Sequence, residues 1–161
     1  MKTHYDQLIR NAAAEYLHEG FDWRIIKAQF WQESRFQPDA VSPAGAQGVA
    51  QIMPGTWGQW KLPHYDDPFN AEQSIMTGCR YMGYLINQWS WPRPEMDRVC
   101  LALASYNSGL GHMLNAQKLA DNSNLYAPVI HKLPDVTGTH SAETIDYVKK
   151  ILGFYVQELT K

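Results

Sequence analysis

Apolar side chains in this chain recur at the spacing of an α-helix. In the stretch that follows Ser141, the recurring residues are Ile145, Val148, Leu152, Tyr155 and Leu159. Steps of three and four residues place such side chains on one side of a helix, where they can pack on a core. Residues 94–107 carry a second stripe, made of Val99, Ala102, Leu103 and Tyr106. The sequence therefore predicts a mainly α fold.

Capping and turn residues set the expected ends of these helices. Gly20 ends the first, Asp22 caps the second, and Asp67 with Pro68 starts a long one, because these residue types favour helix ends. The expected helices cover residues 3–19, the segment between Asp22 and Pro38, 67–89, 94–107, about 111–120, and the end of the chain from Ser141. Residues 36–48 and 121–140 are expected to be loops, and 91–94 a short rigid connector.

The composition is that of one globular domain, residues 1–161. A chain of 161 residues can bury a core, and 45% hydrophobic with 19% charged residues is typical of a soluble protein and not of a disordered one. The net charge of −2 gives no general attraction to nucleic acid or anionic lipid. No apolar run approaches the roughly 20 residues of a membrane-spanning helix. We therefore expect no nucleic-acid partner and no membrane insertion.

Glu33 is an acid on the apolar face of its predicted helix. It follows Ile26 and Phe30 at i, i+4 and i+7 spacing, which puts the three side chains on one side. Burial among apolar groups raises the pKa of a carboxyl group, and a raised pKa suits a general acid near neutral pH. The alternative is that the helix ends here and Glu33 extends into solvent.

Three segments around and beyond Glu33 resemble one family. The first begins with Glu33-Ser34, has Ser42 nine residues after the glutamate, and continues with Gly48-Val49-Ala50-Gln51, Met53-Pro54 and Thr56-Trp57. The second is Leu103-Ala104-Ser105-Tyr106-Asn107-Ser108-Gly109, and the third is Glu143-Thr144-Ile145-Asp146-Tyr147-Val148. In this order they resemble the lytic transglycosylases of the lysozyme-like superfamily, which cleave the glycan strands of bacterial peptidoglycan. The resemblance implies a lysozyme-like helical domain with a short loop or hairpin, at 36–48, beside the active-site groove.

The resemblance also implies a reaction and its acid. Glu33 would protonate the β-1,4 glycosidic oxygen between MurNAc and GlcNAc, then take a proton from the C6 hydroxyl of MurNAc, giving a 1,6-anhydro end without a cofactor. Most glycosidases use a second carboxylate, and the nearby Asp39, Asp66 and Asp67 lie outside the matched motifs. This mildly favours transglycosylation. A goose-type lysozyme-like muramidase, which uses water, is the alternative, and an inactive wall-binding module is a third.

The same resemblance assigns substrate-binding residues, and each assignment has a structural alternative. The assigned residues are Ser42, Gln51, Met53, Tyr106, Asn107, Glu143 and Tyr147. The alternatives are a turn residue for Ser42, a core residue for Met53, a helix-ending residue for Asn107 and a favourable first-turn acid for Glu143. Tyr106 is expected to pack inward with its hydroxyl free to reach Glu33. Glu143 and Tyr147 are expected to point into the same groove.

Two departures from the family pattern stand out. Val49 and Ala50 replace Leu and Met in the family's Gly-Leu-Met-Gln turn, which shrinks the second side chain. Ile145 stands where the family often has Arg, so a cation that could pair with a peptide carboxylate is missing. This substitution puts recognition of the peptide stem in doubt.

Metal binding, cysteine pairing and localisation complete the expectations. No two of the six histidines have the i, i+4 spacing of a zinc helix, so we expect no metal site. Cys79 and Cys100 are expected to be buried free thiols, with a single disulfide as the alternative.

The first ten residues lack the apolar core of a secretory signal. For an enzyme acting on the periplasmic wall, this favours a phage-encoded protein over one that has lost a leader. A monomer is expected.

Overall fold

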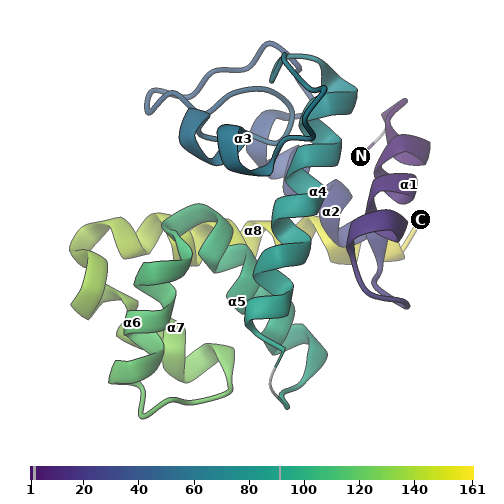
Figure 1. Ribbon diagram of the computed structural model, residues 1–161. Coiled ribbons are helices and arrows are strands. Elements are labelled where there is room, and N and C mark those ends of the chain that lie inside the picture. The colour runs from purple at the N-terminus through teal and green to yellow at the C-terminus, as the bar shows by residue number, and fades with distance from the viewer. Residues whose placement is uncertain (2, 91) are drawn as a thin grey trace. The chain divides into compact units, whose positions relative to one another are not determined.

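The computed structural model describes residues 1, 3–90 and 92–161, and helices dominate it (Figure 1). Its elements are α1 (Asp6–Tyr16), α2 (Trp23–Ser34), α3 (Pro54–Trp60), α4 (Ala71–Gln88), α5 (Glu95–Ser108), α6 (Leu110–Leu119), α7 (Tyr126–Thr137), the 3-10 turn η1 (Gly138–His140) and α8 (Ser141–Leu159). The described residues form no strand, only isolated antiparallel bridges that join Gln47 to Val41 and to Ile52. The predicted mainly α fold, with a short hairpin-like loop, is confirmed.

Contacts within the chain divide it into two compact units. The first unit comprises Met1–Gly83 and Ile151–Lys161, and the second comprises Tyr84–Lys150. The prediction of a single domain stays a prediction.

In the first unit, α1 packs on α2 through buried residues that include Ile9, Ala12 and Ile26. Asp22 caps α2 as predicted, because its side chain accepts a hydrogen bond from the Arg24 N–H. The Tyr155 hydroxyl donates to the same carboxylate at 2.9 Å. The start of α2 is therefore fixed both locally and from the end of α8.

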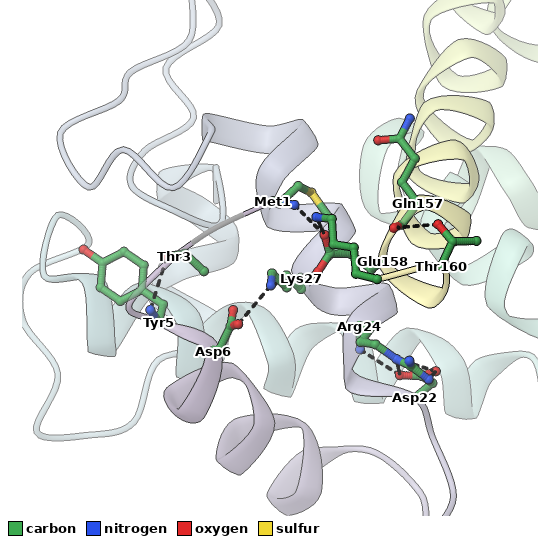
Figure 2. Close-up of polar contacts among 11 residues, drawn as sticks. Met1, Thr3, Tyr5, Asp6, Asp22, Arg24, Lys27, Gln157, Glu158 and Thr160 are labelled. Atoms are coloured by element: carbon green, nitrogen blue, oxygen red, sulfur yellow. Dashed lines mark hydrogen bonds and ion pairs between the residues drawn. The ribbon is translucent and has the colours of Figure 1, made fainter.

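A buried cation also holds α2 in the first unit. The Lys27 ammonium is 2.9 Å from a carboxylate oxygen of Asp6 and 2.9 Å from one of Glu158, and its side chain is only 4% exposed (Figure 2). Burial alone would raise the pKa of Glu158, but hydrogen bonds from Lys161, the terminal ammonium of Met1 and Lys27 outweigh it and lower the pKa to about 2. This cluster ties α1, α2 and the end of α8 together.

In the second unit, α5 is buried on every side from Val99 to Ser105. The indole N–H of Trp89 donates to the Ser105 hydroxyl at 3.0 Å, and that hydroxyl donates to the carbonyl of Leu101 at 2.7 Å. Helices α6 and α7 pack on α5 and on each other. The interior of this unit is thus centred on α5.

The two cysteines are free and buried, as expected. Burial raises the pKa of both thiols, and that of Cys100 reaches about 12. Thiols held in the protonated form are poor nucleophiles, so neither cysteine has the character of a reactive residue.

The prediction that 121–140 is a loop is wrong, because α7 and η1 occupy most of it. The first backbone N–H of α7, that of Tyr126, donates at 2.5 Å to the Asp97 carboxylate in α5. The residue that precedes α7, Leu125, supplies no side-chain cap. The signal that starts this helix therefore comes from a distant residue.

Other helices also differ from prediction. Asp67 does not cap α4: its carboxylate accepts from the N–H of Phe69, and the Asn70 side chain accepts from Gln73 in the first turn. The first helix spans only Asp6–Tyr16, and α3 was not expected. Trp91, in the predicted connector, lies outside the described residues.

The predicted stripe on the last helix is partly wrong. Ile145 and Leu159 are 39% and 46% exposed, whereas Thr144, Tyr147, Val148 and Ile151 are buried. Thr144 and Tyr147 are buried although their side chains carry hydroxyl groups. A pattern built from apolar residues alone therefore places the buried face of α8 slightly off its true position.

Candidate active site

Glu33 lies in the last turn of α2 and is partly exposed, so neither the fully buried nor the fully solvated expectation describes it. The next residue, Ser34, is buried, and its hydroxyl donates to the carbonyl of Val49 at 2.8 Å. Beyond it, Arg35 and Phe36 both have left-handed backbones, with φ of 56° and 63°. The end of the helix is thus fixed on one side by a sharp reversal and on the other by a bond to the 47–52 turn.

The loop after α2 is held by its own side chains. Ser42 N–H donates to the Ala46 carbonyl at 2.9 Å, and the Ser42 hydroxyl accepts from Ala46 N–H at 3.0 Å. The Gln51 side-chain amide donates to the carbonyls of Ala40 and Gly48 at 3.1 and 2.9 Å. These bonds use the hydroxyl of Ser42 only as an acceptor and the amide of Gln51 only as a donor. In the described part of the chain no further bond involves the Ser42 proton or Gln51 Oε1, so both can still bond a ligand.

Close backbone approach explains the small residues of the 47–52 turn. Gly48 has φ of +75°, and a Cβ built there would lie 2.1 Å from the Pro68 carbonyl oxygen. A Cβ at Gly78 in α4 would lie 2.7 Å from the Ala50 Cβ and 2.9 Å from the Phe30 ring. Ala50, where the family pattern has Met, therefore sits where α4 comes close.

Met53 immediately precedes α3 and is 45% exposed. The alternative that it fills the core is therefore wrong. Trp57, four residues later in α3, is buried. Asp39, Asp66 and Asp67, the carboxylates considered as partners for Glu33, are all exposed.

The second unit contains a cavity of about 410 Å³ with polar walls. It is lined by Asn107, Ser108, His112, Thr137, His140, Glu143 and Thr144. The Thr144 hydroxyl donates to Asn107 Oδ1 at 2.7 Å, and Asn107 Nδ2 donates to a carboxylate oxygen of Glu143 at 3.5 Å. Because the carboxylate only accepts, this pair fixes the orientation of the Asn107 amide. The interpretation of Asn107 as a helix-ending residue also fits, since α5 ends one residue later.

The two candidate tyrosines of this unit differ in burial. Tyr106 is partly exposed in the last turn of α5, whereas Tyr147 is only 5% exposed and Glu143, one helical turn earlier, is exposed. Of the sequence-predicted residues, Asn107 and Glu143 therefore share this cavity, and neither tyrosine lines it. The roles given to Tyr106 and Tyr147 stay predictions.

Sequence reasoning missed five residues of this cavity. Ser108 and Thr144 lie inside the matched segments but were not singled out, and Thr137, His140 and His112 come from α7, η1 and α6. The two histidines are 28 positions apart, by subtraction of their numbers. Only knowledge of how the helices pack could have joined them.

Among the described residues, none of the helices combines the length and hydrophobicity that crossing a membrane requires.

Comparison with known proteins places the chain in a family. Residues 8–127 match the model of the transglycosylase SLT domain. The chain is 31% identical over 168 residues to the membrane-bound lytic murein transglycosylase F of Alteromonas mediterranea, covering 95% of this chain and 35% of that protein. It is 39% identical over 101 residues to the Haemophilus influenzae protein of the same name, and this match covers 63% of this chain and 20% of that protein.

Two solved structures are similar along nearly the whole chain. The 70 kDa soluble lytic transglycosylase of Escherichia coli superposes with a TM-score of 0.73 and 25% identity, over 94% of this chain and 23% of that one. The second structure is an inactive mutant of the lytic transglycosylase Slt of Pseudomonas aeruginosa, in which a glutamate is replaced by glutamine. It superposes with a TM-score of 0.74 and 27% identity, over 98% of this chain and 24% of that one. The chain thus spans about a third or less of each of these proteins, and it belongs to the transglycosylase SLT domain family.

Proposed function

We propose that this chain is a peptidoglycan lytic transglycosylase that cleaves the β-1,4 bond between MurNAc and GlcNAc. The observation that carries the proposal is a single glutamate, Glu33, at a rigidly held helix end in a chain of this family. The relatives above are named as lytic murein transglycosylases. The similar Pseudomonas enzyme is described as inactive with a glutamate-to-glutamine change.

In the proposed reaction, Glu33 acts first as an acid and then as a base. Its carboxyl proton goes to the glycosidic oxygen while the bond from that oxygen to C1 of MurNAc breaks, which releases GlcNAc with a free hydroxyl. The resulting carboxylate takes the proton of the MurNAc C6 hydroxyl, and O6 closes on C1. Glu33 ends protonated and no water is consumed, so a second carboxylate is not required.

The proposed sugar contacts follow the positions of the side chains. Exposed Met53 and the remaining bonding capacity of Ser42 and Gln51 suit a glycan bound to the first unit. Asn107 and Glu143 suit one bound to the second. Tyr106 and Tyr147 complete the proposed set. The proposed place of action is the cell wall. A phage source and a monomeric state stay predictions, and the relatives named above are bacterial.

The test is digestion of purified peptidoglycan, with mass spectrometry of the released fragments. We expect products one water lighter than those of a hydrolase, because the 1,6-anhydro ring replaces the added water. Fragments with ordinary reducing ends would contradict the proposal and make the chain a hydrolase.

The role of the acid is tested with Glu33→Gln, because an amide cannot donate the required proton. We expect release to fall by about 10³-fold or more. Glu72→Gln, at an exposed acid in the first turn of α4, serves as the matched control and should keep the parental rate. Parental lysis by Glu33→Gln would show that another residue is the acid.

A further inference from the structure

The cavity of the second unit has walls that suit uncharged polar groups. Its lining residues include Asn, Ser, Thr and His but neither Lys nor Arg, and its acid, Glu143, repels an anion. Ile145, where the family often has Arg, adds no cation to the first turns of α8. The volume of about 410 Å³ lies within the range of small-ligand pockets. A carboxylate is therefore a poor occupant, and hydroxyl or amide groups are good ones.

His112 is held in one orientation on the wall of this cavity. Its Nδ1 lies 2.7 Å from the backbone carbonyl oxygen of Ser108, the last residue of α5. A carbonyl oxygen only accepts, so Nδ1 carries the hydrogen and Nε2 of the neutral ring carries the lone pair. The side chain is exposed, and no residue in the described part of the chain is bonded to Nε2. The ring thus presents a fixed acceptor.

The neighbouring Ser108 adds a hydroxyl without a partner. Its Oγ is buried and makes no hydrogen bond within the described structure. A rotation about the Cα–Cβ bond would turn it toward a ligand and remove the penalty of an unpaired buried group.

We infer that His112, assisted by Ser108, is a specificity-determining residue that binds an uncharged sugar ring of the glycan strand. Nε2 of His112 accepts a hydrogen bond from a sugar hydroxyl or acetamido N–H in the cavity, and the Ser108 hydroxyl makes a second contact. This inference rests on the proposed function, because it names the part of the substrate that the second unit reads. The cavity thus selects the glycan and not the carboxylates of its peptides.

Two substitutions of His112 separate binding from stability. Asparagine can place its amide near the Nδ1 position and keep the bond to the Ser108 carbonyl, but it does not reach the Nε2 position. Glutamine reaches the Nε2 position and loses the bond to that carbonyl. In the Glu33→Gln background, affinity for a β-1,4-linked GlcNAc tetramer is measured by isothermal titration calorimetry, together with the melting temperature.

We expect opposite patterns from the two variants. His112→Asn should weaken binding of the tetramer by about 3- to 10-fold with an unchanged melting temperature. His112→Gln should stay within about 2-fold in affinity and melt about 2–4 °C lower. Ser108→Ala should weaken binding without lowering the melting temperature. His131→Asn, at an exposed histidine of α7 outside the cavity, should change neither value.

Parental affinity in His112→Asn would overturn the inference and leave the proposed function intact. The inference would also be overturned if His112→Asn weakened the binding of peptide-bearing fragments but not that of the tetramer. If the Glu33→Gln parent binds peptide-bearing fragments but not the tetramer, the cavity reads the peptide, and the inference is again wrong. Failure of the proposed function has a separate signature, since the wild-type chain would then release no 1,6-anhydro products from peptidoglycan.

Discussion

The end of α2 and the cavity of the second unit are built in different ways. At the end of α2, backbone geometry fixes Glu33: two left-handed residues follow it, and two glycines allow close approach of neighbouring segments. In the cavity, side-chain hydrogen bonds fix Asn107 and Glu143. A backbone-built site tolerates few changes of residue size, whereas a side-chain network can change its specificity one residue at a time. The proposed chemistry resides in the first and the proposed recognition in the second.

The largest effect is expected from Gly48→Ala in the 47–52 turn. The added Cβ would collide with the Pro68 carbonyl, and the positive φ would be strained as well. We expect the free energy of unfolding to fall by roughly 3 kcal/mol, measured by urea denaturation. Gly58→Ala in α3, where nothing lies within 4 Å, is the control and should be neutral or stabilising. Equal effects at the two glycines would mean that backbone approach does not set this turn.

Ser34→Ala should have the next largest effect. It removes the bond that the buried hydroxyl donates to the Val49 carbonyl. The free energy of unfolding should fall by about 1–3 kcal/mol. Because Glu33 is the preceding residue, kcat should fall more than KM rises. A rise in KM alone would show that this bond does not position the acid.

Thr144→Val tests the side-chain network of the second unit. It keeps the shape of residue 144 but removes the bond to Asn107 Oδ1. We expect stability to fall by about 1 kcal/mol and KM to rise several-fold with kcat little changed, in steady-state assays on soluble glycan. A change in kcat as large as that from Ser34→Ala would erase the contrast between the two regions.

The last prediction concerns how the stability of the first unit depends on pH. Its effect is absent near neutral pH and develops only on acidification, so it ranks as the smallest. The folded-state pKa of Glu158 is lowered to about 2 from an ordinary 4.5. Its contribution is therefore complete above about pH 4.5 and is lost as the pH falls toward 2. Melting curves from pH 7 to 2 should show this loss, and Glu158→Gln should flatten it. An unchanged slope in that variant would assign acid sensitivity to other carboxylates.

Sequence patterns predicted the helices whose signals are local. Asp22 caps α2 within its own first turn, and the stripe of α5 is buried as expected. They failed for α7, which takes its capping acceptor from Asp97 and contains Pro134. They also placed the start of α4 at Asp67, whereas the side chain that accepts from the first turn is that of Asn70, a residue type that caps helices as readily as Asp.

The candidate site was predictable only where residues fall within contiguous motifs. Asn107 and Glu143 were found in this way, and the structure brings them together. His112 and His140 reach the same cavity through the packing of separate helices. A cavity wall assembled from distant segments leaves no period or spacing in the sequence.

The contact between Ala50 and Gly78 bears on engineering by consensus. Replacing an unusual residue with the one its relatives prefer often stabilises a protein. Here the methionine of the family pattern would meet α4 at its closest approach, where even a methyl group on Gly78 would be too large. Residue 78 is already glycine, so no smaller residue there can make room, and the consensus methionine at residue 50 is expected to destabilise the chain.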